Sequence, residues 1–172
     1  MMNRMIRKIA AVAVACVLLG RISNLAAVDA VSVELGRGED RTNVIRIAVS
    51  HYWHKREPLP DKWRLAGYWE FSGAIWDNPD DSSANIGITP VFRFERNRFY
   101  VEAAIGFHLV QTHISAERSF STAFQFADHI GAGMHFGRYD LCLRFQHFSN
   151  GGLADRNPGI NFVLMRLQYA LE

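Results

Sequence analysis

A histidine and a serine two residues apart, His147 and Ser149, stand near the C-terminal end of the sequence, in the stretch HFSNGG. In an extended strand, side chains at positions i and i+2 point to the same face, so the imidazole could reach the serine hydroxyl. A hydroxyl beside a base is the usual form of a nucleophilic serine. Asn150, Gly151 and Gly152 follow at once, and their N–H groups could face a developing oxyanion. The pattern predicts a serine hydrolase site, although H-x-S also occurs at the ends of ordinary strands.

The residues around this pair alternate in polarity with a period of two. One face of segment 141–149 holds Leu141, Leu143, Phe145, His147 and Ser149, and the other holds Cys142, Arg144, Gln146 and Phe148. The centre of a strand in a soluble protein does not bury Arg and Gln without partners. In a membrane barrel, by contrast, the apolar face meets lipid and the polar face lines a lumen. Segment 161–171 repeats the pattern, with Arg166 and Gln168 opposite an apolar face, so the alternation favours a membrane barrel.

Eight segments of the chain are predicted to be strands. They are residues 31–37, 43–52, 62–73, 85–94, 98–110, 122–137, 139–149 and 159–171. Strands of about ten residues can cross a bilayer at a tilt, and eight is the smallest usual number for an outer-membrane barrel. We therefore predict an all-β fold, an eight-stranded antiparallel up-and-down transmembrane β-barrel, with long connections at 73–85 and 110–122. The alternative is a soluble sandwich or a lipocalin-like barrel, which would bury the apolar face inside.

The first 27 residues are predicted to be a secretory signal peptide. They combine the basic start MMNRMIRK with the apolar run IAAVAVACVLLG, and cleavage is expected after Ala27 or Ala30. Residues 28–172 then form one domain, the barrel. Cys142 is the single cysteine of that domain, so it cannot form an internal disulfide. The net charge is only +2 and no basic run stands out, so a nucleic-acid partner is not expected.

The stretch HFSNGGL…NPGIN resembles the lipid A 3-O-deacylase family of outer-membrane barrels, the PagL type. The resemblance is specific over residues 144–169 and architectural over the rest of the mature chain. It implies an integral outer-membrane enzyme that hydrolyses the 3-O-linked 3-hydroxyacyl chain of lipid A, part of lipopolysaccharide, in the outer leaflet. It also implies that Ser149 is the nucleophile and His147 the general base, with oxyanion donors at Asn150, Gly151 and Gly152. This scheme requires no metal or organic cofactor, and it leaves a homodimer open.

The sequence departs from the family pattern at the third member of the catalytic triad. The family has Glu fourteen residues after the histidine, where this sequence has Asn161. The alternation places Asn161 on the same face as His147 and Ser149. An amide oxygen can hold a histidine tautomer, as in Cys-His-Asn proteases, but it stabilises the imidazolium less than a carboxylate does. Asp155, in the connecting turn, is the alternative acid.

Other polar clusters are weaker candidates for a site. His51 and His54 have no carboxylate or cysteine companion for a metal ion. Asp77, Asp80 and Asp81 lack the glycine and the terminal glutamate of a calcium-binding loop, which favours a solvated loop. The alternative to an enzyme is a non-catalytic barrel with a structural or ligand-binding role.

Overall fold

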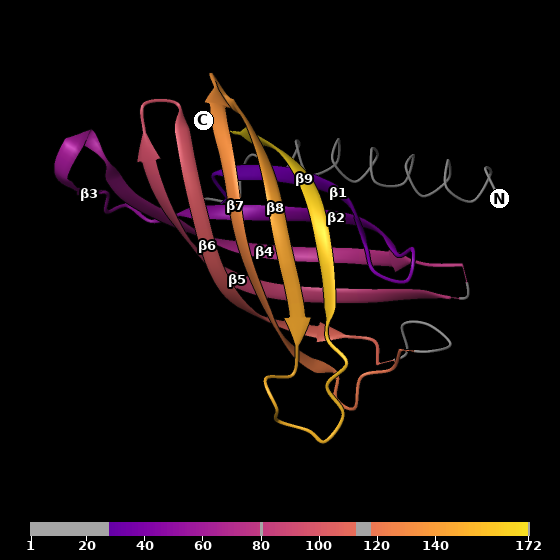
Figure 1. Ribbon diagram of the computed structural model, residues 1–172. Coiled ribbons are helices and arrows are strands. Elements are labelled where there is room, and N and C mark those ends of the chain that lie inside the picture. The colour runs from indigo at the N-terminus through magenta and orange to yellow at the C-terminus, as the bar shows by residue number, and fades with distance from the viewer. Residues whose placement is uncertain (1–27, 80, 113–117, 172) are drawn as a thin grey trace.

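Eight long strands close into an antiparallel barrel in the computed structural model, which describes residues 28–79, 81–112 and 118–171 (Figure 1). These strands are β1 (Ala30–Gly38), β2 (Asn43–Tyr52), β4 (Arg64–Asp77), β5 (Ser82–Arg96), β6 (Phe99–Val110), β7 (Phe124–Phe136), β8 (Tyr139–Ser149) and β9 (Ile160–Ala170). Each pairs with the next long strand along the chain, and β1 also pairs with β9, which closes the ring. The predicted eight-stranded up-and-down barrel is confirmed. The predicted signal peptide lies outside the described residues.

The connections differ between the two ends of the barrel. At the end that carries Ala30 and Ala170, the turns after β5 and β7 are short, and the connection from β2 to β4 holds a short strand, β3 (Glu57–Pro58), and a 3-10 turn, η1 (Pro60–Lys62). We call this the terminal end. The opposite end, called the loop end, carries the connections 39–42, 78–81, 111–123 and 150–159.

The predicted long connection at 73–85 is wrong, because β4 and β5 continue through most of it. The two strands pair as far as Asp77 and Ser82, so only residues 78–81 connect them. The polar run WDNPDDSS indicated a loop because its side chains suit solvent. A ladder that extends past the apolar band into water can carry such residues, and Trp76 still points inward there, fully buried.

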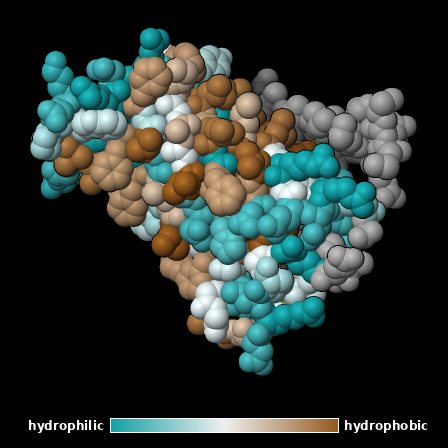
Figure 2. All heavy atoms as spheres, in the orientation of Figure 1, coloured by the Kyte–Doolittle hydropathy of each residue, from teal (hydrophilic) through white to brown (hydrophobic). Residues whose placement is uncertain are grey.

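The outer surface of the barrel is apolar. Ile105, Ile130 and Leu143 point outward and are 61%, 65% and 56% exposed. In Figure 2, hydrophobic side chains form a broad band on the visible face, between hydrophilic ones at the upper left and others toward the right and the bottom. A soluble sandwich or lipocalin-like barrel would bury these residues, so this distribution supports a lipid-facing surface. Among the described residues, no helix is long and apolar enough to cross a membrane.

The interior is filled by a network of buried charges with Arg144 at its centre. The guanidinium of Arg144 lies 2.6 Å from Glu34, 3.0 Å from Glu70 and 2.7 Å from Glu102, and all four side chains are at most 3% exposed. Buried charges are tolerated when they are paired and hydrogen-bonded. The alternating Arg, Gln and Glu residues of the sequence are therefore inside the barrel, as predicted.

Toward the loop end, the interior changes to an aromatic cluster. The Trp76 ring lies 4.8 Å from the Phe148 ring and 4.9 Å from the Phe162 ring, measured between centroids, and all three side chains are buried. Phe148 belongs to the end of β8 and Phe162 to the start of β9. Their packing fixes which way the neighbouring side chains of both strands point.

Candidate active site

The outward face at the junction of β8 and β9 brings His147 and Asn161 together. The two residues are direct partners in the β8–β9 ladder. Because Phe148 and Phe162 point inward, the residues that alternate with them, His147, Ser149 and Asn161, point outward and are half-buried. The site therefore opens on the outer surface of the barrel, at the loop end.

The imidazole of His147 is held by Asn161. Its Nδ1 lies 2.8 Å from the Asn161 Oδ1, and because an amide oxygen only accepts, Nδ1 carries the proton. In the neutral tautomer that this hydrogen bond selects, the other ring nitrogen, Nε2, has a lone pair and can act as a base. Asp155, the alternative acid, is exposed in the 150–159 loop and makes no hydrogen bond to His147 within the described part of the chain.

Ser149, the last residue of β8, stands two positions beyond His147 on the same face. Among the described residues, the Ser149 Oγ forms no hydrogen bond to the imidazole or to any other group. A catalytic hydrogen bond is often long in a free enzyme and forms only with substrate bound. What the structure shows is that Ser149 and His147 share one face of β8, as the side chains of a nucleophile and its base must.

Asn150, one of the expected oxyanion donors, is hydrogen-bonded within the 150–159 loop. Its side chain is fully buried, and its Nδ2 donates to the Arg156 carbonyl at 3.0 Å. Its Oδ1 accepts the Gly152 N–H at 2.8 Å, and its own N–H donates to Asn157. Of the N–H groups of Asn150, Gly151 and Gly152, only that of Gly151 has no acceptor in the described ranges. Asn150 thus organises the loop, and Gly151 offers the available donor.

Gly159 packs against the imidazole, a contact that was not predicted from the sequence. A Cβ atom built on this residue would lie only 2.9 Å from His147 Cε1, and its φ is +57°, a conformation that favours glycine. The only hint of this contact in the sequence is the position of Gly159 between Pro158 and Ile160, just before β9. Gly159 therefore sets how closely the 150–159 loop approaches the base.

We expect Gly159→Ala to lower the rate of ester hydrolysis expected of His147 and Ser149 by roughly 10- to 100-fold, because the added methyl group would push the imidazole out of position. The initial rate of ester hydrolysis measures this effect. Gly137→Ala is the matched control, since Gly137 has a similar φ of +62° but a Cβ atom added there would meet nothing within 4 Å. If both variants lost the same activity, the cause would be backbone strain at the positive φ and not the contact with the imidazole.

Two acidic residues also stand beside the site, and neither was found from the sequence. Glu39, which follows β1, accepts a hydrogen bond at 2.8 Å from Asn161 Nδ2. Asp128 on β7 is the ladder partner of His147 on its other side, without an ion pair or hydrogen bond to it among the described residues. Both lie far from the H-x-S stretch in sequence. Only barrel closure and strand register could have located them.

Metal binding has no support in the described residues. No group of three or more His, Cys, Asp or Glu side chains there is arranged to hold an ion. The His51 imidazole instead lies 3.1 Å from the Asp29 carboxylate, at the terminal end. Asp80 of the acidic run lies outside the described residues.

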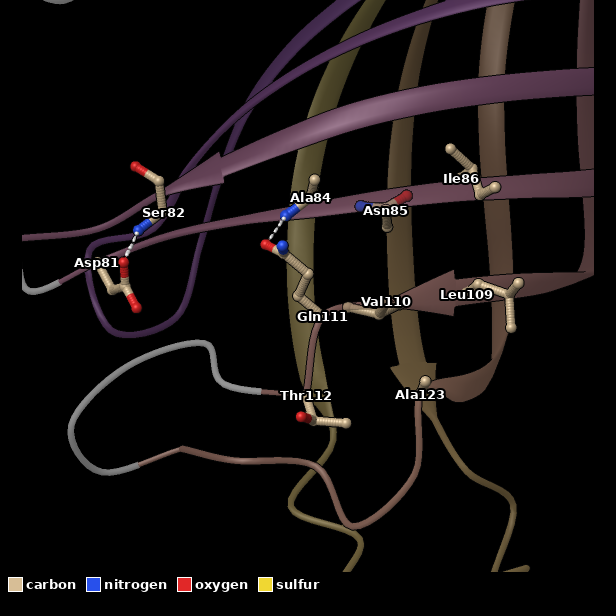
Figure 3. Close-up of a pocket in the computed structure, with 10 residues that line it drawn as sticks. All are labelled: Asp81, Ser82, Ala84, Asn85, Ile86, Leu109, Val110, Gln111, Thr112 and Ala123. Carbon is tan, nitrogen blue, oxygen red and sulfur yellow. Dashed lines mark hydrogen bonds between the residues drawn. The ribbon is translucent and has the colours of Figure 1, made fainter.

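A separate hollow lies at the loop ends of β5 and β6, shown in Figure 3. Gln111 Oε1 accepts the N–H of Ala84 at 2.9 Å across it, and Asp81 accepts the N–H of Ser82 at 2.7 Å. Its described lining residues include the carboxylate of Asp81 but no histidine and no cysteine.

Comparison with known proteins identifies the family of the chain. The family model described as "Lipid A 3-O-deacylase (PagL)" matches residues 44–170, which include the whole β8–β9 junction. The chain belongs to the lipid A 3-O-deacylase family. The family assignment confirms the resemblance read from HFSNGGL…NPGIN.

The chain is also similar to two individual proteins, one by sequence and one by fold. The chain is 34% identical over 109 residues to lipid A deacylase PagL of Bordetella bronchiseptica, an alignment that covers 60% of this chain and 58% of that protein. Its fold is similar to the crystal structure of the outer membrane enzyme PagL, with a TM-score of 0.73 and 26% identity over 81% of this chain and 98% of the other. The similarity to the solved structure therefore extends over nearly the whole barrel.

Proposed function

We propose that this protein is an integral outer-membrane esterase that removes the 3-O-linked 3-hydroxyacyl chain from lipid A, with Ser149 as nucleophile and His147 as general base. The observation that carries the proposal is the His147–Asn161 hydrogen bond of 2.8 Å on the outward face, beside an unengaged Ser149. It gives the imidazole the tautomer that a general base needs. Membership of the deacylase family supports the substrate class.

The reaction proceeds by acyl transfer to the serine. Ser149 Oγ attacks the ester carbonyl carbon while its proton passes to Nε2 of His147, and the carbonyl oxygen becomes an oxyanion. In this scheme the Gly151 N–H donates a hydrogen bond to that oxygen. The tetrahedral intermediate then expels the sugar 3-oxygen, which takes the proton from His147. Water then attacks the acyl-enzyme carbonyl as His147 takes its proton, and the bond to Ser149 Oγ breaks as that oxygen recovers the proton from His147, which releases the 3-hydroxy fatty acid.

The outer leaflet is the proposed place of reaction. In outer-membrane barrels, short turns face the periplasm and longer loops face outward. The two-residue turns after β5 and β7 share the terminal end, whereas the 111–123 and 150–159 connections share the loop end with the site. A lipid whose head group lies at the outer surface can then bring an ester bond to Ser149 while its chains stay in the bilayer. Polar groups at that position on a lipid-facing surface are costly unless they act there.

Mass spectrometry of lipid A tests the proposal. Cells that produce the wild-type protein should yield lipid A lighter by one 3-hydroxyacyl group than cells that produce the His147→Ala variant at the same level. Identical spectra from the two strains, with both proteins folded in the outer membrane, would contradict the proposal and favour a non-catalytic barrel. Cross-linking in the same membranes tests the homodimer that the sequence left open.

A further inference from the structure

The side chain of Asn161 is held from two sides. Its Oδ1 faces His147 Nδ1 at 2.8 Å, and its Nδ2 donates to Glu39 Oε1, also at 2.8 Å. The backbone N–H of Glu39 donates to the Asn161 carbonyl at 3.2 Å as well. Main chain and side chain together attach Glu39 to the start of β9, directly behind the residue that holds the base.

The side-chain amide of an asparagine in this position can have either of two orientations, and only one of them supports a general base. The two ends of a carboxamide have opposite character, because the oxygen accepts and the NH₂ group donates. If Nδ2 of Asn161 faced the imidazole, Nδ1 of His147 would have to accept, and the ring proton would move to Nε2. An imidazole protonated at Nε2 cannot take the proton of Ser149, which is how an Asp-to-Asn change in a serine protease triad lowers activity. A carboxylate avoids this problem because both its ends accept.

Glu39 removes the ambiguity. Its carboxylate only accepts hydrogen bonds, so it can bind the NH₂ end of Asn161 and not the oxygen. We propose that Glu39 is a positioning residue of the deacylation site, which fixes the Asn161 amide with its oxygen toward His147 and so keeps the imidazole in its basic tautomer. This inference rests on the proposed function. In effect, Asn161 and Glu39 together replace the single glutamate of the family pattern.

Arg118 holds Glu39 in place. Its guanidinium lies 3.1 Å from Glu39 Oε2, which leaves Oε1 for Asn161, and it lies 2.7 Å from Asp40 Oδ2. It also donates to the carbonyl of Gly159, the residue that packs on the imidazole. Asp40 shares the guanidinium with Glu39 but is not bonded to Asn161 within the described residues. It therefore provides a control for the ion pair alone.

The test is a reciprocal exchange of the two side chains, measured with the purified full barrel in detergent micelles and lipid A as substrate. Glu39→Gln should lower kcat on the order of tenfold with KM unchanged, because glutamine can donate as well as accept and no longer dictates the amide orientation. Asn161→Glu alone places two carboxylates together and should also lower kcat. In the double variant Glu39→Gln/Asn161→Glu, residue 161 presents a carboxylate to the imidazole and residue 39 presents an amide to that carboxylate. This variant should return kcat to at least the wild-type level.

Asp40→Asn is the matched control and should leave kcat unchanged, because it removes only a partner of Arg118. Full activity in folded Glu39→Gln, or a double variant no more active than the worse single variant, would overturn the positioning role. Loss of kcat in Asp40→Asn equal to that in Glu39→Gln would also overturn it, since the ion pair alone would then explain the effect. An inactive wild-type protein would instead overturn the proposed function, so the two failures are distinguishable.

Discussion

We expect Ser149→Ala to reduce the rate of lipid A deacylation by roughly 10⁴-fold or more, because no other described group at the β8–β9 junction can form the acyl-enzyme. His147 would keep its hydrogen bond to Asn161 but would have no hydroxyl to deprotonate. Initial rates of 3-hydroxy fatty acid release by the purified variant measure the loss.

The Ser149→Ala barrel should remain folded, because the Ser149 side chain makes no hydrogen bond within the described residues. Retained heat-modifiable mobility on SDS gels would show this. Ser119→Ala is the control, since Ser119 is a partly exposed serine in another loop of the same end, and its Oγ donates to the Thr112 carbonyl at 3.2 Å. A folded Ser149→Ala protein with near-normal activity would require a different nucleophile.

The second large effect concerns stability. Arg144→Leu should lower the free energy of unfolding by about 3–5 kcal/mol, because the carboxylates of Glu34, Glu70 and Glu102 would lose the cation that each contacts inside the barrel. Urea unfolding in micelles, followed by tryptophan fluorescence, measures the change.

Arg138→Leu is the control for Arg144→Leu. It removes an exposed arginine of the β7–β8 turn, whose guanidinium donates to the Tyr169 hydroxyl at 3.3 Å. Exposed polar contacts of this kind contribute little, so stability should change by less than about 1 kcal/mol. If both variants lost the same stability, the interior network would not be what holds the barrel together.

The fold was predictable because lipid and lumen demand opposite side chains. In β8 and β9, the outward Leu143, Phe145 and Val163 alternate with the inward Arg144 and Arg166, and each strand therefore indicates its own orientation. The prediction of a long connection at 73–85 was wrong because this alternation is lost there. Above the apolar band, both faces of a strand can be polar, so the alternation ends before the hydrogen-bonded ladder does.

The pairing of charges inside the barrel could not be predicted from the sequence. The alternation predicted that Arg144 points inward, but its partners Glu34, Glu70 and Glu102 come from β1, β4 and β6. Which charges meet depends on the stagger between strands and on how long side chains cross the lumen. Neither quantity has a local signal in the chain.

The shared outward face of His147, Ser149 and Asn161 could be predicted from the sequence, because it follows from their spacing along two strands joined by one loop. Glu39 is 122 residues from Asn161 in sequence and reaches it only because β1 closes onto β9. The role of Asn150 within the loop was also missed, because it depends on the conformation of residues 150–159.

In the proposed function, Ser149 is activated by His147 and attacks an ester from the lipid-facing surface of the barrel. Labelling of the protein in micelles with a long-chain alkyl fluorophosphonate, followed by peptide mass spectrometry, tests this role of the two residues. We expect one covalent adduct, on Ser149, which forms far more slowly in the His147→Ala variant. An adduct on another residue, or labelling of Ser149 at the same rate without His147, would contradict it.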